Sequence, residues 1–116
     1  MIEQGDVIWV DLPPAIGSAP AGRRPAVVLQ HDRFNRSKIN TVVVVAITSN
    51  LKYSALPGNV RLSKGEAGLA KPSVANVTQL ATIDRDHVIG KLGRVSHARL
   101  EEIWNGVRLV LEPDPG

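Results

Sequence analysis

Residues 41–49 (TVVVVAITS) constrain the fold of this 116-residue chain more than any other segment. Their β-branched side chains favour a strand, because such side chains pack well on a pleated sheet. The four consecutive valines at 42–45 do not alternate with polar residues, which indicates a strand that is covered on both faces. We therefore expect this segment to lie in the core.

Segments on either side of this run predict further strands. Residues 7–12 (VIWVDL) end at two prolines, and residues 25–30 (PAVVLQ) begin with a proline, which a strand tolerates at its first position. The prolines and glycines of residues 13–24 predict a loop between them. Weaker patterns predict a short strand at 59–63, a turn-rich loop at 64–72, a strand with room for a bend at 73–83 and a short strand at 88–95.

The end of the chain has a helical period instead. Apolar residues recur on one helical face at Leu100, Ile103, Trp104, Val107 and Leu111. Ser96 is the expected N-cap, and Pro113 marks the end of the helix. An order of strands followed by one helix predicts a mainly β fold, a twisted antiparallel sheet or small barrel with one C-terminal helix. We expect a single domain over residues 1–116, with Trp9 and Trp104 in its core.

The composition excludes several classes of site. The chain has no cysteine, so it forms no disulfide, zinc–thiolate site, iron–sulfur cluster or cysteine nucleophile. It also lacks GxxxxGK[ST] and GxGxxG, the usual nucleotide-binding loops. His31, His87 and His97 lie far apart and form no metal-binding pair, and Asp84 and Asp86 are expected to cap a short turn. We predict no metal site.

The sequence also restricts the cellular compartment and the partner. The longest purely apolar stretch, residues 42–47, is far shorter than the ~18–20 residues of a membrane helix, and the first residues do not resemble a signal peptide. Together with the absence of cysteine, this predicts a cytoplasmic protein. A net charge of +3 and a pI of 9.7 permit an anionic partner such as RNA or DNA.

Two small groups of residues could carry chemistry. Arg23 and Arg24 stand directly before Pro25, where a strand is expected to begin, and Thr48 and Ser49 stand at the end of the valine-rich strand. A guanidinium offers a fixed fork of donors that matches phosphate oxygens, and the two hydroxyls come from a stiff element. Together they could bind a phosphodiester, although spacing alone does not distinguish them from ordinary surface residues.

The order of five segments resembles the MazF/PemK toxin family over nearly the whole chain. These segments are GDVIWVDL at 5–12, Gly-Ser at 17–18, RPAVVLQ at 24–30, TVVVVAITS at 41–49 and QLATID at 79–84. The resemblance implies an SH3-like antiparallel β-barrel with a C-terminal helix, usually a homodimer. It further implies the toxin of a type II toxin–antitoxin system. Such a toxin is an endoribonuclease that cuts single-stranded mRNA at short sequences without a metal or other cofactor, and a cognate MazE-like antitoxin neutralises it.

The same resemblance assigns roles to individual residues. Arg24 matches the catalytic arginine of the family and Thr48 its threonine, while Ser49 and Gln79 fall at positions that line the RNA groove. The implied reaction is attack of the substrate's 2′-OH on the adjacent phosphorus, which yields a 2′,3′-cyclic phosphate and a 5′-OH and therefore needs RNA. The remaining expected RNA contacts are Arg23, Lys52 and Tyr53, the last of which, like Phe34, could stack on a base.

Two departures from the family pattern leave the general base unassigned. An acidic residue often follows Gly-Ser, where this chain has Ala19, and some members have an aspartate where it has Thr78. Asp84, His31 or a water could substitute. These losses favour an alternative, a non-catalytic toxin or binding module like CcdB that acts on DNA gyrase or another protein. The pair formed by Arg24-Pro25 and the Ile-Thr-Ser at 47–49 favours the nuclease.

Overall fold

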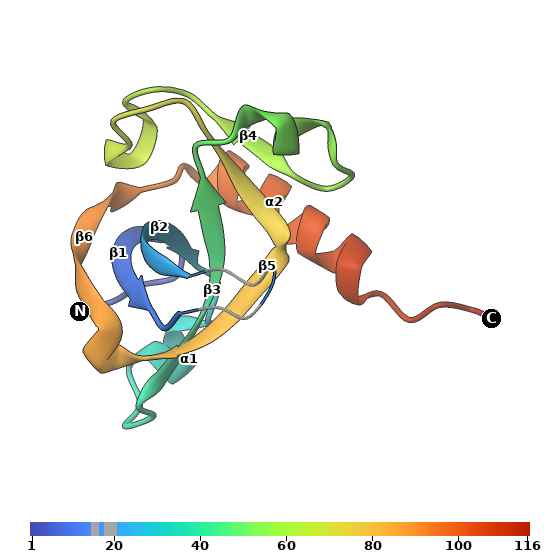
Figure 1. Cartoon of the computed structure of the whole chain (residues 1–116). Coiled ribbons are helices and arrows are strands. Elements are labelled where there is room, and N and C mark those ends of the chain that lie inside the picture. The colour runs from blue at the N-terminus through green and yellow to red at the C-terminus, as the bar shows by residue number, and fades with distance from the viewer. Residues whose placement is uncertain (15–16, 18–20) are drawn as a thin grey trace.

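A computed structural model describes residues 1–14, 17 and 21–116 of the chain. Six strands form one antiparallel sheet in the order β4-β5-β3-β2-β1-β6, which curls into a half-barrel (Figure 1). The strands are β1 (Asp6–Leu12), β2 (Gly22–Val28), β3 (Thr41–Thr48), β4 (Val60–Leu62), β5 (Ser73–Asp84) and β6 (Val88–Arg94). The helices are α1 (Asp32–Asn35) and α2 (His97–Leu111), with 3₁₀ turns η1 (Leu51–Ala55), η2 (Glu66–Gly68) and η3 (Arg85–His87).

The valine-rich strand β3 is buried on both faces, as its sequence predicts. Val45 and Ile47 pack in one apolar cluster, together with Ile103 of α2. Val42 and Val44 point to the other face, into a second cluster that contains Val10 of β1. Because neighbouring side chains of a strand alternate between faces, a strand covered on both sides needs apolar residues at every position. The non-alternating valines supply them.

Strand β2 begins earlier than expected, and this corrects the position of Pro25. It starts at Gly22, so Arg23 and Arg24 belong to the strand and not to the preceding loop, and Pro25 lies in its middle. β2 pairs with β1 from Gly22 to Val27, but with β3 only from Ala26 to Val28. Proline has no N–H to donate to a ladder, which accounts for the end of the β2–β3 pairing directly after Pro25.

The two edges of the sheet, β4 and β6, are bridged by the turn η2. A Cβ atom on Gly68 would overlap the carbonyl group of Leu92 in β6, and a Cβ on Gly93 would overlap the backbone of Ala67. Gly68 also has a φ of 80°, which favours glycine. On this side of the half-barrel, η2 therefore packs directly against the backbone of β6. Residues with a side chain at positions 68 and 93 would keep η2 and β6 further apart.

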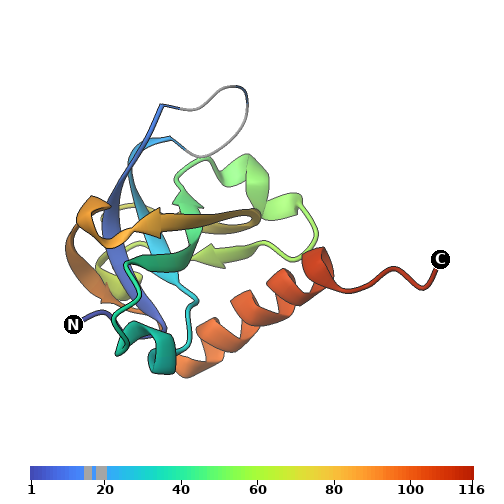
Figure 2. The ribbon, with the colours of Figure 1, turned by 90° about the horizontal axis from the view of Figure 1, so that it is seen from below.

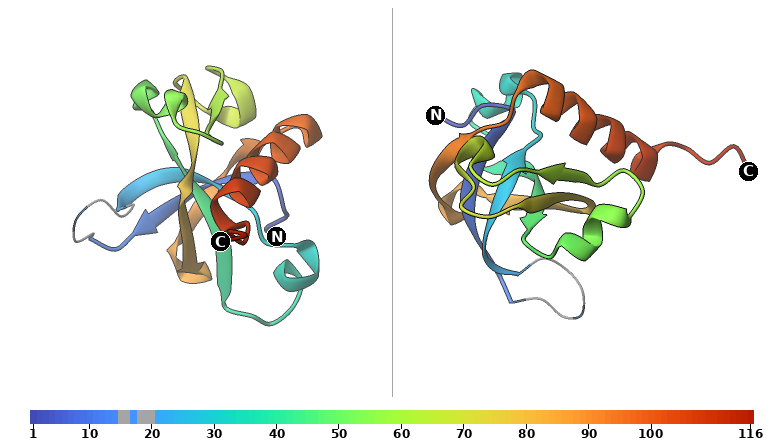
Figure 3. Two further views of the ribbon diagram at one scale, coloured as in Figure 1. Left: turned by 90° about the vertical axis from the view of Figure 1, so that its right-hand side faces the viewer. Right: turned by 90° about the horizontal axis from the view of Figure 1, so that it is seen from above.

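Helix α2 lies alongside the sheet next to β4 and β5, and the last residues of the chain extend beyond it (Figures 2 and 3). Ser96 caps it by accepting the Arg99 N–H at 3.1 Å, and the helix ends before Pro113, as predicted. Ile103 and Val107 are buried, but Trp104 is 45% exposed, so its predicted place in the core is wrong. No helix among the described residues is long and apolar enough to cross a membrane.

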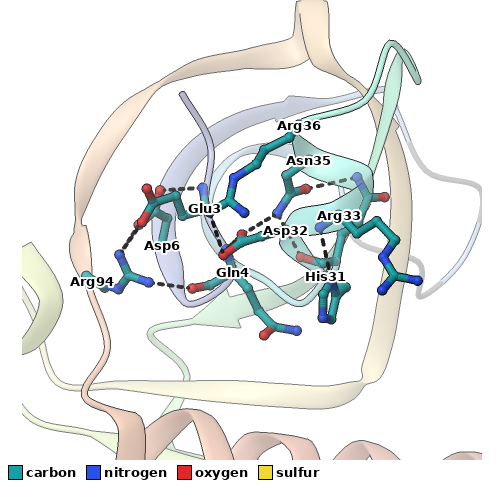
Figure 4. Close-up of polar contacts among 10 residues, drawn as sticks. Glu3, Gln4, Asp6, His31, Asp32, Arg33, Asn35, Arg36 and Arg94 are labelled. Carbon is teal, nitrogen blue, oxygen red and sulfur yellow. Dashed lines mark hydrogen bonds and ion pairs between the residues drawn. The ribbon is translucent and has the colours of Figure 1, made fainter.

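A polar cluster joins the amino-terminal segment to α1 and β6 (Figure 4). Glu3 accepts a hydrogen bond from Arg94 at 2.6 Å, and Asp32 accepts from the Gln4 N–H at 2.7 Å and from Asn35 at 3.1 Å. The hydrogen bond and charge of Arg94 lower the pKa of Glu3, and the bonds from Gln4 and Asn35 lower the pKa of Asp32. Both carboxylates thus favour the folded state when ionised.

We expect this cluster to make the protein less stable in acid. The pKa values of Glu3 and Asp32 are lower in the folded state than their ordinary values of 4.5 and 3.8. Their contribution is complete above those ordinary values and is lost progressively as the pH falls below them and through the lowered pKa values of the folded state. Urea unfolding at pH 7, 5, 4 and 3 measures this loss. The double variant Glu3→Gln/Asp32→Asn should lose less stability over the same range, and an equal loss in both proteins would contradict the assignment.

We also expect Gly106→Ala to destabilise the protein, although alanine is the better helix former by about 1 kcal/mol. Gly106 lies in the buried face of α2, where a Cβ would overlap the carbonyl group of Gly58. Such overpacking typically costs about 1–3 kcal/mol, measured as the free energy of unfolding in urea. Gly90→Ala is the control, because no atom of the described residues, apart from its chain neighbours, lies within 4 Å of the position of its Cβ. Equal stability of Gly106→Ala and the wild type would disprove the close contact.

Candidate active site

A hollow of about 490 Å³ opens where β2 and β3 separate. β2 contributes Arg23, Arg24 and Pro25, and the end of β3 contributes Thr48, with Ser49 directly after it. The arrowhead of β3 in Figure 1 points toward the segments that carry η1, β4 and η2. The segment that carries η2 forms another wall of the hollow. The remaining lining residues are Trp9, Ile47, Gly68, Leu69, Ala70, Lys71, Ser73 and Leu92.

The register of the sheet explains why Arg24 and Thr48 border the same hollow. Ala26 of β2 lies opposite Ala46 of β3. Continuing this register by two residues places Arg24 opposite Thr48, and residues opposite each other share a face of the sheet. Because the ladder ends at Ala26, the two strands are not joined at this point. The two side chains border an open hollow there.

Hydrogen bonds hold both side chains and leave donors available. Arg24 donates from Nε to the carbonyl oxygen of Ala21 at 3.0 Å, and no described residue accepts a hydrogen bond from its terminal NH₂ groups, which can therefore donate to a ligand. Thr48 Oγ1 accepts the N–H of Asn50 at 3.1 Å, which leaves its own O–H to donate. Arg24 and Thr48 are both half-buried. A rigid guanidinium beside a hydroxyl donor suits the oxygens of a phosphate.

The charged residues that line the hollow are all positive. Its lining contains the cations Arg23, Arg24 and Lys71, and among the described residues that line it there is no carboxylate and no histidine. Two other hollows differ, because Glu101 lines one of them and Glu102 and Glu112 line the other. A cluster of cations in a concave surface attracts anions. Nowhere in the described part of the chain do three or more His, Asp or Glu side chains gather as metal ligands.

The structure places the expected site residues in two groups. Arg23, Arg24, Thr48 and Ser49 border the hollow. Lys52 and Tyr53 lie in η1 and Gln79 in β5, and these three, with Phe34 of α1, are absent from the described lining. Sequence reasoning did not find Lys71, because it stands in the turn-rich loop without a motif of its own. It placed Trp9 in the core, whereas Trp9 is 38% exposed and faces the hollow.

The residues considered as general base do not reach this lining. Asp84 caps η3 by accepting the Asp86 N–H at 2.9 Å, as the sequence predicts, and His31 caps α1. Thr78 is exposed, and its hydroxyl bonds Asn76 Oδ1 at 3.2 Å. Ala19, the other departure from the family pattern, lies outside the described residues, as does Ser18. The site supplies groups that bind and stabilise an anion.

Comparison with known proteins identifies the family. A model described as "PemK-like, MazF-like toxin of type II toxin-antitoxin system" matches residues 3–111. The chain belongs to this family. It is 38% identical to endoribonuclease MazF6 of Mycobacterium tuberculosis over 97% of this chain and 98% of that protein. It is 34% identical to endoribonuclease MazF of Staphylococcus saprophyticus, over 96% of this chain and 92% of the relative.

Solved structures show the same fold. MazF from Deinococcus radiodurans superposes with a TM-score of 0.80, at 24% identity and with 97% of each chain covered. Toxin MazF-mt6 of Mycobacterium tuberculosis gives a TM-score of 0.77 at 17% identity, covering 94% of this chain and 98% of that one. The antiparallel β fold with one C-terminal helix that the sequence predicts, of the MazF type, is therefore confirmed.

Proposed function

We propose that this protein is the toxin of a type II toxin–antitoxin system, an endoribonuclease that cuts single-stranded mRNA without a metal or other cofactor. The observation that carries this proposal is that Arg24 and Thr48 border the same hollow, which is lined by cations. Relatives at 34–38% identity over nearly the whole chain carry the name endoribonuclease, which supports the nuclease over a CcdB-like protein that acts on gyrase. All of residues 1–116 would act as one domain.

The proposed reaction uses the substrate's own nucleophile. The ribose 2′-oxygen gives its proton to water as it forms a bond to phosphorus, and the bond from phosphorus to the 5′-oxygen breaks, so that this oxygen leaves with a proton taken from water. Negative charge grows meanwhile on the non-bridging oxygens, toward which Arg24 would donate from its terminal NH₂ groups. Thr48 would orient the phosphate through its hydroxyl. An arginine stays protonated at neutral pH and cannot take the proton of the 2′-OH.

The other expected RNA contacts follow from their positions. Arg23 and Ser49 border the hollow and would hold the backbone next to the cut. Lys52, Tyr53 and Gln79 lie outside its described lining. They would meet RNA only further along the strand. An enzyme of this kind works where mRNA is, so we place it in the cytoplasm.

Two protein partners belong to this proposal. The first is a cognate MazE-like antitoxin, which would neutralise the toxin by occupying the cationic hollow. In support, an endoribonuclease from a mycobacterial species has been solved with its cognate antitoxin, and MazF of Deinococcus radiodurans has been solved with MazE. The second partner is another copy of this chain, in a homodimer.

We expect Arg24→Ala to lower the rate of RNA cleavage by about 10²–10³, because losing one such donor typically costs about 2.7–4 kcal/mol in the transition state. The assay follows cleavage of a long single-stranded RNA in EDTA, and sequencing of the fragments' 5′ ends maps the cut sites. Arg108→Ala is the matched control, since Arg108 is an exposed arginine of α2 outside this hollow. The same strand made of DNA should remain intact.

Equal cleavage by wild type and Arg24→Ala would refute the proposed mechanism, and so would complete dependence on Mg²⁺. A gyrase pull-down without any RNA products would instead favour the CcdB-like alternative.

Lys71→Ala should weaken binding of single-stranded RNA and reduce its dependence on salt. A lysine that neutralises one phosphate contributes about 0.7 to the slope of log K against log salt concentration for a single strand. Fluorescence polarisation of a labelled RNA at several salt concentrations measures this slope. Lys64→Ala is the control, because Lys64 is an exposed lysine of the same segment that does not line the hollow. An identical slope in both variants would show that Lys71 does not contact a phosphate of the RNA.

A further inference from the structure

Trp9 is the large aromatic side chain that borders the hollow, and the mechanism proposed above gives it no role. It stands in β1 opposite Pro25 of β2, and it lines the same hollow as Arg23, Arg24 and Lys71. Its neighbours Ile8 and Val10 are essentially fully buried, whereas Trp9 is 38% exposed. An exposed indole on a rigid strand, beside a group that can bind a phosphate, is positioned to contact what is attached to that phosphate.

The two residues opposite Trp9 leave its side chain accessible. Pro25 of β2 lies opposite it on one side, and Gly90 of β6 lies opposite it on the other. Residues opposite each other share a face of the sheet, so Gly90 adds no side chain where one would flank the indole. The ladder between β1 and β6 is irregular directly after this pair.

The fold does not require a glycine at position 90. Apart from its chain neighbours, no atom of the described residues lies within 4 Å of the place where its Cβ would stand, and Gly90 is absent from the residues with positive φ. This contrasts with Gly68 and Gly93, whose Cβ atoms would overlap backbone atoms. The open space beside Gly90 is therefore available for a ligand that flanks Trp9.

We propose that Trp9 is a stacking platform for a nucleobase adjacent to the cleaved phosphodiester, and that Gly90 keeps the flank of its indole open for that base. This rests on the proposed function, because the phosphate bound by Arg24 and Lys71 fixes where the bases lie. Stacking on an aromatic ring holds a base without reading its identity, and the ring is already fixed by its strand. Trp9 would thus raise affinity and orient the strand for attack.

Trp104 provides a matched comparison within the same chain. It is also exposed, at 45%, but it lines a different hollow, together with His31, His97 and Glu101. No arginine or lysine is among the described residues of that lining. The two tryptophans therefore differ in their electrostatic surroundings and not in their accessibility.

The first test observes Trp9 directly. In the variant Trp104→Phe, Trp9 is the only tryptophan, because the chain has two. The probe is a short RNA spanning a mapped cut site, with a 2′-deoxy sugar at the cut so that it binds without being cleaved. We expect saturable quenching of the tryptophan emission at the RNA concentrations at which polarisation reports binding. Unchanged emission at saturation would overturn the proposal.

The second test uses substitutions with different expected results. Trp9→Ala should weaken RNA binding by about 5- to 100-fold and raise KM more than it lowers kcat, while Trp9→Phe should retain most of the affinity. Gly90→Val should weaken binding while leaving the unfolding temperature near that of the wild type, since the described residues leave the surroundings of its Cβ open. Normal RNA binding by both Gly90→Val and a folded Trp9→Ala would refute the proposal.

The third test identifies the base and separates stacking from a purely structural role. Oligonucleotides that each carry one abasic residue near the cut are assayed with wild type and Trp9→Ala. At one position the abasic change should weaken binding to the wild type and have little effect on Trp9→Ala. Equal losses in both proteins at every position would contradict stacking.

If Trp104→Phe cleaves RNA but the three tests give the contradicting results, only the inference about Trp9 is refuted. Absence of RNA cleavage by the wild type would instead refute the proposed function itself.

Discussion

The site depends on the place where the β2–β3 ladder ends. Pro25 has no N–H, and pairing between the two strands begins only at Ala26. β2 nevertheless remains paired with β1 as far as Gly22, so Arg24 stays on a rigid strand while its other side is open. The result combines a side chain held firmly in place with space for a ligand, which a continuous ladder would not provide.

A second constraint closes the half-barrel and completes the hollow. Gly68 and Gly93 allow the backbone of η2 to approach β6 more closely than side chains would permit. The chain that follows η2 then runs past the open end of β2 and brings Lys71 to the lining. One close packing contact thus bridges the two edges of the sheet and adds a cation to the site.

The distribution of charge separates structural cations from those of the site. Arg94 pairs with Glu3, Lys91 with Asp6, and Arg99 with Glu66 and Glu102. Among the ion pairs of the described residues, none involves Arg23, Arg24 or Lys71. The net charge of +3 is modest. Around the hollow, however, these cations have no carboxylate beside them among the described lining residues, and such a surface favours an anion.

The sequence by itself determined the fold class, the central strand and the closing helix, because each is encoded in a local pattern: consecutive valines, a helical period and a cap at Ser96. It also named Arg24 and Thr48, which stand in short recognisable motifs. Tertiary structure alone decided that Trp9 and Lys71 line the hollow and that His31 and His97 both line another one. Exposure depends on which residue stands opposite across the sheet, and Gly90 is 81 positions away from Trp9 along the chain. No local sequence pattern predicts such a neighbour.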